Sequence, residues 1–116
     1  MRIGYPEDVL RGMRPGQRVC FQGGPGECEA FYNILRDNPG FANGVELWSC
    51  LIPGINTRDY GSLPGSTTLT TFMASPALAP SIASGRTRIT AMPYSEIAAL
   101  MAATEFDLAV MHTSSS

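Results

Sequence analysis

The sequence predicts an α/β fold with an open, mostly parallel sheet flanked by helices. Short apolar segments rich in β-forming residues, such as 18–22 and 45–52, are bounded by glycine and proline, as buried strands are. Segments with apolar residues at helical spacing, such as 27–38 and 95–104, lie between such strands. Strands that alternate with helices form βαβ units, whose crossovers make neighbouring strands parallel.

The chain is predicted to form a single domain over residues 1–116. Its 116 residues match the usual size of one domain and allow one modest core. A hydrophobic content of 44% with 16% charged residues lies in the globular range and argues against a disordered chain.

The first half of the chain holds the clearest βα unit. A short helix is expected to begin at Pro6 and to end near Gly12 or Pro15, because proline and the following acids suit a first turn. The strand 18–22 comes next, and a helix is predicted from Glu27 to just before Pro39. One face of that helix carries the apolar residues Ala30, Phe31, Ile34 and Leu35.

The middle of the chain is predicted to be less regular. After the strand 45–52, the segment 53–68 is rich in glycine and proline and is expected to form a long loop, a kind that is usually functional in compact domains. A short strand over 69–73, a short helix within 75–85 and a strand over 86–92 follow.

The last unit is a helix followed by a strand. Ser95 is predicted to cap a helix, and the strand 107–113 follows it. The helix has a stripe at i, i+3, i+4 and i+7, formed by Ile97, Leu100, Met101 and Thr104.

Charge and composition exclude several functions. The net charge is −2, so the chain lacks the basic field with which proteins hold nucleic acid. All eight basic residues are arginines, which excludes a lysine Schiff base or a P-loop lysine. Segments as apolar as a signal peptide or a membrane span are missing, so we expect no membrane partner and a cytoplasmic location.

The cysteines and the histidine do not indicate a metal site. Cys20, Cys28 and Cys50 form no CxxC pair, and His112 is distant in sequence. Cys20 and Cys50 lie in apolar strand-like segments, where a reduced cysteine acts as a small hydrophobe, and this suits a reducing cytoplasm. We therefore predict no metal and no cofactor.

The stretch GGPGE, between the first strand and the first long helix, is the candidate binding site. In an open parallel sheet, ligands bind beyond the carboxyl ends of the strands. Glycines remove side chains there, and the N–H groups at the helix start would attract a thioester oxyanion, a carboxylate or a phosphate. A glycine turn with a purely structural role is the alternative. The predicted binding residues are Gly23, Gly24, Pro25, Gly26 and Glu27.

Longer stretches carry a resemblance to a known family. The segments GQRVCFQGGPGECEAF, VELWSCLIPG, FMASPALAPSIASGRTRITAMPYSEI and FDLAVMHTSSS together resemble the N-terminal domain of the acetyl-CoA hydrolase/transferase family, which includes the 4-hydroxybutyrate and succinyl:acetate CoA-transferases. The resemblance runs from about residue 8 to residue 116. Its most specific part is SGRTRITAMPYSEI, followed by Asp107 and Ala109 at the family's usual interval.

The resemblance implies a CoA-transferase-like fold in which two similar domains face each other across the active site. In that family a glutamate of the second domain attacks the acyl-CoA thioester. The resemblance implies that this chain ends before that domain, so we expect a domain truncated at its C-terminal side and inactive alone. Neither Glu27 nor Glu96 matches the nucleophile's motif, so no catalytic residue is assigned. The glycine turn is implied to lie beside the acyl group, with acyl-CoA as substrate and a small carboxylate as acceptor.

Two alternatives remain open. The chain could be a stand-alone module that binds acyl-CoA or another anion without chemistry, or a structural subunit that completes the site of a separate catalytic chain. The fragment hypothesis also predicts an exposed apolar surface, and hence a homo-oligomer such as a dimer.

Outside the loop, other residues have less specific interpretations. Arg86 and Arg88 share one face of a strand and could meet the CoA phosphates, although a solvated or subunit-facing role fits them as well. Trp48 and Phe72 are expected in the core. The long loop offers four further candidates for substrate or interdomain contact: Asn56, Arg58, Asp59 and Tyr60.

Overall fold

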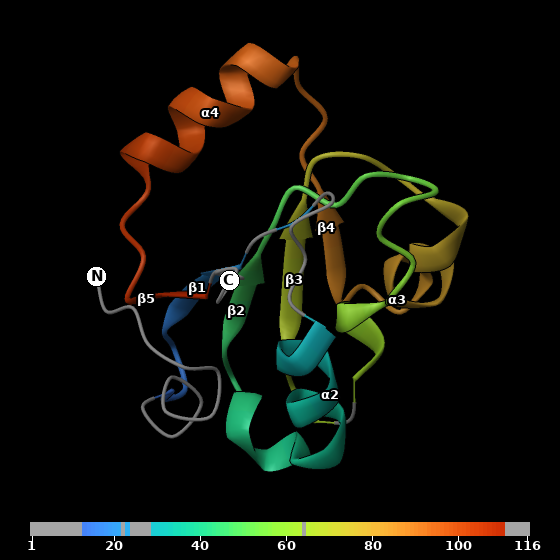
Figure 1. The fold of residues 1–116 in the computed structure, drawn as a ribbon, viewed down its shortest axis with the longest axis vertical. Coiled ribbons are helices and arrows are strands. Elements are labelled where there is room, and N and C mark those ends of the chain that lie inside the picture. The colour runs from blue at the N-terminus through green and yellow to red at the C-terminus, as the bar shows by residue number, and fades with distance from the viewer. Residues whose placement is uncertain (1–12, 22, 24–28, 64, 111–116) are drawn as a thin grey trace, which may run out of the picture.

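A parallel five-stranded sheet forms the centre of the molecule, which confirms the predicted α/β class (Figure 1). The structure is a computed structural model, and it describes residues 13–21, 23, 29–63 and 65–110. The strands are arranged in the order β4-β3-β2-β1-β5, and all four pairings between neighbours are parallel. Their bounds are Arg18–Phe21 (β1), Glu46–Trp48 (β2), Thr68–Thr71 (β3), Thr87–Ile89 (β4) and Leu108–Val110 (β5).

The register places one row of residues straight across the sheet. Cys20 of β1 pairs with Ala109 on one side and with Trp48 on the other, and the row continues through Thr70 to Arg88. Because side chains alternate between the two faces along each strand, this row and the residues two positions before it face the same side.

Helical residues pack against both faces of the sheet: Phe31 and Leu35 against one face and Ile97 against the other. From β1 to β4, each new strand lies on the same side of the strand before it, whereas β5 lies on the other side of β1. Because the crossovers between parallel strands are right-handed, the helix before β5 lies on the opposite face of the sheet from the earlier helices. The α-helices are α2 (Glu29–Asp37), α3 (Ala79–Ala83) and α4 (Tyr94–Ala103), and the 3-10 turns are η2 (Pro39–Ala42), η3 (Tyr60–Ser62) and η4 (Pro76–Leu78).

The larger core lies between the sheet and α2. Phe31 and Leu35 of α2 are buried against Val19 and Leu47 of the central strands. Tyr60, fully buried, stacks close to Phe21, with 4.3 Å between the ring centroids. Burial of an aromatic side chain contributes roughly 2–3 kcal/mol to stability. Tyr60 belongs to the segment between β2 and β3, so its burial fixes how this segment packs on the sheet.

A smaller core lies between the other face and α4. It consists of Trp48, Phe72 and Ile97, with Cys20 and Cys50 packed at its edge. Trp48 and Phe72 are therefore core residues, as the sequence predicts.

Several predicted elements are shorter than expected. The segment 45–52 forms a strand only at Glu46–Trp48, because β3 ends at Thr71 and the Leu51 N–H donates to the hydroxyl of Thr71 instead of to a strand backbone. The segment 75–85 divides into η4 and α3, and Pro80 is accommodated because it occupies the first turn of α3.

Two details of the predicted helices are wrong. α4 begins at Tyr94 with Pro93 as its N-cap, and Ser95 lies inside the first turn, where the N–H groups of Glu96 and Ile97 donate to the Pro93 carbonyl. In α2, Ala30 is exposed, so the buried stripe is narrower than the periodicity suggests. The helix expected from Pro6 lies largely outside the described residues.

Candidate functional site

The strand order creates a switch point between β1 and β5. The chain leaves β1 toward β2 over one face, and it reaches β5 from β4 over the other. In open α/β sheets the crevice beyond the carboxyl ends of two such strands is the usual binding site. Gly23 stands two residues after the end of β1, so the glycine-rich stretch begins beyond the carboxyl end of this strand.

Gly23 packs tightly against the segment that follows β2. A Cβ placed on Gly23 would overlap the carbonyl oxygen of Cys50 and would lie 2.8 Å from the hydroxyl oxygen of Ser49. The Cys50 carbonyl is backbone and cannot turn aside as a side-chain tip can. This close approach is by itself a sufficient reason for glycine at position 23.

The rest of the predicted loop, Gly24, Pro25, Gly26 and Glu27, lies outside the described residues, as do Cys28 and His112. The amide cradle therefore remains a prediction, supported at one end by the position of Gly23.

Ser49 is a site residue that the sequence analysis missed. Its side chain is fully buried, and within the described part of the chain its hydroxyl has no hydrogen-bond partner. An unpaired buried hydroxyl costs about 1–3 kcal/mol, so such a group next to Gly23 is a candidate donor to a ligand. In the sequence it is one of several small polar residues, and only the approach of Gly23 across the sheet singles it out.

The candidates of the long loop have structural roles. Asn56 is buried, and its side-chain oxygen accepts from the Ile52 N–H at 2.8 Å. The Arg58 guanidinium pairs with Glu29 of α2 at 3.4 Å and lies over the ring of Tyr32. Tyr60, fully buried in the larger core, is likewise part of the packing. The loop is thus fastened to α2 and to itself.

Asp59 anchors a buried polar network that joins the loop to α3 and β4. Its carboxylate accepts from the hydroxyl of Ser62 at 2.7 Å and from both the hydroxyl and the N–H of Ser81, at 2.5 and 3.2 Å. The Ser81 hydroxyl also shares a hydrogen bond of 2.6 Å with that of Thr87. Because Ser81 is fully buried, the network holds the scaffold rather than a ligand.

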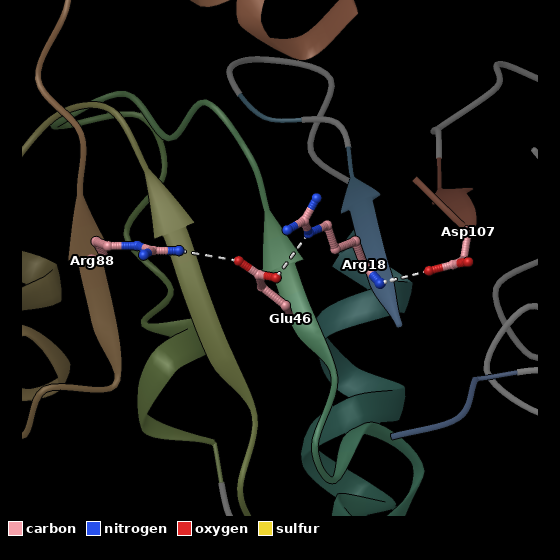
Figure 2. Close-up of polar contacts among 4 residues, drawn as sticks. All are labelled: Arg18, Glu46, Arg88 and Asp107. Carbon is pink, nitrogen blue, oxygen red and sulfur yellow. Dashed lines mark hydrogen bonds and ion pairs between the residues drawn. The ribbon is translucent and has the colours of Figure 1, made fainter. Parts of the chain in front are cut away.

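A group of charged side chains lies on the α4 face near the amino ends of the strands (Figure 2). Glu46 of β2 receives Arg18 of β1 at 3.1 Å and Arg88 of β4 at 3.2 Å, so Arg88 reaches across β3. The Arg18 N–H donates to Asp107, which precedes β5, at 2.9 Å. The two ion pairs join β1, β2 and β4, and the hydrogen bond to Asp107 adds the residue before β5.

The structure keeps Arg86 and Arg88 away from Gly23. Three strand spacings and at least three residues along a strand separate them, on the order of 20 Å. The two arginines therefore do not converge with Gly23 on one small group.

Cys20 and Cys50 are not joined in a disulfide, and both thiols lie half-buried at the edge of the smaller core. Burial raises the pKa of the Cys20 thiol, because the low-polarity surroundings disfavour the thiolate. An apolar, protonated thiol agrees with the predicted role of a small hydrophobe.

Three further observations concern the described residues as a set. No helix among them is long and apolar enough to cross a membrane. Within the same residues, His, Cys, Asp and Glu form no group that could hold a metal ion. Among the side chains that the structure describes, Ile55 is the single exposed large hydrophobic one, at 52% exposure, and the dimer stays a prediction.

Comparisons with known proteins add no assignment. The chain matches no protein-family model, no curated protein and no solved structure. The functional conclusion therefore depends on the site itself and on the motifs in the sequence.

Proposed function

We propose that this chain is the N-terminal part of an acyl-CoA transferase or acyl-CoA hydrolase with a CoA-transferase-like fold. In this proposal the loop that begins at Gly23 binds the acyl or carboxylate group, and the catalytic glutamate comes from a second domain or subunit. One observation carries the proposal: the strand order places Gly23 at the switch point between β1 and β5.

The chemistry of the site supports this choice. A bare backbone turn can bring N–H groups within hydrogen-bond distance of the oxyanion that forms when a thioester is attacked, and one such donor is worth roughly 3–4 kcal/mol in a transition state. The unpaired hydroxyl of Ser49 supplies a further donor beside Gly23. The described residues of the site provide a hydrogen-bond donor, and in this proposal the nucleophile comes from the second domain.

Calorimetric titration with acetyl-CoA tests the loop. The purified chain is expected to bind acetyl-CoA, and Gly26→Val is expected to abolish binding because the side chain would occupy the space of the ligand. Gly40→Val is the matched control, since Gly40 is exposed on the η2 turn with open space around it. Equal binding by both variants, or no binding by the unaltered chain, would refute the proposal.

Ser49→Ala separates a ligand-binding role from a structural one. Removing an unpaired buried hydroxyl is expected to leave the free energy of unfolding unchanged or to raise it, whereas acetyl-CoA affinity should fall about tenfold with the lost hydrogen bond. Ser84→Ala, on the exposed end of α3, should change neither binding nor the site. If Ser49→Ala destabilised the chain and left affinity intact, Ser49 would be structural.

Activity distinguishes part of a transferase or hydrolase from a stand-alone binding module. We expect no thioester exchange by the chain alone and exchange after addition of the second domain of an acetyl-CoA hydrolase/transferase. Binding without exchange in the mixture would favour a stand-alone binding module.

A further inference from the structure

A pocket of about 230 Å³ lies on the α4 face of the sheet, over β2, β3 and β4 and away from Gly23. Its position near the amino ends of these strands separates it from the switch point. The pocket is lined chiefly by polar side chains: Glu46, Thr68, Thr70, Arg86 and Arg88.

The pocket carries more positive than negative charge. Glu46 is its single carboxylate among the described lining residues, and it is shared: one oxygen pairs with Arg88 and the other with Arg18. The Glu46 charge is therefore divided between two guanidinium groups, and Arg86 adds a third. Asp107 contacts the backbone of Arg18 on the far side of β1 and is no part of the pocket lining.

Arg86 is held in a fixed position. Its Nε and Nη2 both donate to the Thr67 carbonyl, at 3.0 and 2.8 Å, and its backbone N–H donates to the Ser81 carbonyl at 3.0 Å. A guanidinium has five N–H donors, so two are used and three remain. An arginine that is already ordered loses little side-chain entropy when it binds a ligand.

Arg88 and the two threonines complete the set of donors. Arg88 lies two residues after Arg86, on the same face, and its side chain is 69% exposed, so it can turn from Glu46 toward a ligand. Thr68 and Thr70 of β3 line the pocket between β2 and β4, and each carries a hydroxyl. Two guanidinium groups with hydroxyls beside them suit a phosphate, which accepts several charged hydrogen bonds at once.

We propose that this pocket binds the phosphate group of a small molecule, with Arg86 as the fixed ligand and Arg88 as the mobile one. The volume is below the roughly 300–1,000 Å³ of pockets that enclose drug-sized ligands, so the pocket holds a phosphate and few further atoms. This site is independent of the proposed acyl-CoA function.

Titration with inorganic phosphate, followed by NMR of the ¹⁵N-labelled chain at constant ionic strength, tests the proposal. We expect saturable shifts at Thr68, Thr70 and the Arg86 and Arg88 Nε–H groups. Arg88→Gln should weaken phosphate binding at least tenfold, while Arg36→Gln, an exposed arginine on α2, should leave it unchanged. Arg88 is exposed, so its replacement should not prevent folding.

Glu46→Gln gives an effect of opposite sign. Without the competing carboxylate, phosphate affinity should rise severalfold. Glu29→Gln removes the same charge from another arginine pair, on α2, and should leave affinity unchanged. The proposal is overturned if chloride or acetate produces the same shifts as phosphate, if Arg88→Gln binds as the unaltered chain does, or if Glu46→Gln and Glu29→Gln behave alike.

Discussion

Replacement of Gly23 by alanine tests whether the start of the glycine loop is set by close packing. The new Cβ would overlap the Cys50 carbonyl oxygen and approach the Ser49 hydroxyl oxygen at 2.8 Å. A backbone carbonyl can move only with its strand end, so the chain must shift locally. Overpacking of this kind costs about 1–3 kcal/mol of unfolding free energy.

Gly40→Ala provides the matched control for this cost. A Cβ at Gly40 meets no atom within 4 Å, so alanine there should be neutral or stabilising by up to about 1 kcal/mol. Urea unfolding followed by circular dichroism measures both variants. With a slope of about 1.5 kcal/mol per molar urea, a cost of about 2 kcal/mol lowers the Gly23→Ala midpoint by roughly 1.3 M.

The unfolding of Gly23→Ala also tests the position of the candidate site. If Gly23→Ala unfolds at the same urea concentration as Gly40→Ala, the close contact with Cys50 does not hold in solution. The inferred position of the loop at the switch point would then lose its structural support. If stability falls as expected, glycine at 23 is explained by packing alone, and ligand binding must be judged from Ser49 and Gly26.

Two further predictions concern half-buried groups. Asp59→Asn should lower the free energy of unfolding by roughly 3 kcal/mol, because the Asp59 carboxylate accepts three hydrogen bonds from Ser62 and Ser81. The control Asp37→Asn, at an exposed position, should change the free energy of unfolding by less than about 0.5 kcal/mol. Equal urea midpoints for the two variants would contradict the network. Because the pKa of Cys20 is raised, the folded chain keeps the Cys20 thiol proton at pH values where the unfolded chain has lost it. The free energy of unfolding should therefore fall as the pH rises past the ordinary thiol range. Cys20→Ala should remove this part of the decline when unfolding is measured at increasing pH.

Local patterns in the sequence were enough to predict the βα units, because they depend on neighbouring residues. The change of hydrophobic period before Phe31 located α2, and the spacing of Ile97 and Leu100 located α4. Boundaries were less accurate: the end of β2 depends on how far β3 extends beside it, and Thr71, which ends that pairing, is distant in sequence.

The candidate site was predictable only in part. The position of Gly23 after a parallel strand follows from the order of elements, but the strand order does not, since a right-handed crossover leads to either side of β1 with the same sequence pattern. Ser49 is a candidate because Gly23, which follows the neighbouring strand, packs against it. Glu46 belongs to the charged group because Arg88 reaches it across β3. Register sets these contacts, and no local periodicity encodes register.

The composition of β3 and β4 indicates that the part of the sheet at the pocket is not a surface on which a helix packs. A parallel strand covered on both faces consists of nearly continuous apolar residues. β3 instead places Leu69 toward the larger core and Thr68 and Thr70 toward the pocket, and β4 presents Arg88 on that side. A helix packed there would bury the Arg88 guanidinium and the Glu46 carboxylate at a cost of several kcal/mol. This part of the sheet is therefore suited to water or to a charged ligand, and phosphate titration decides between the two.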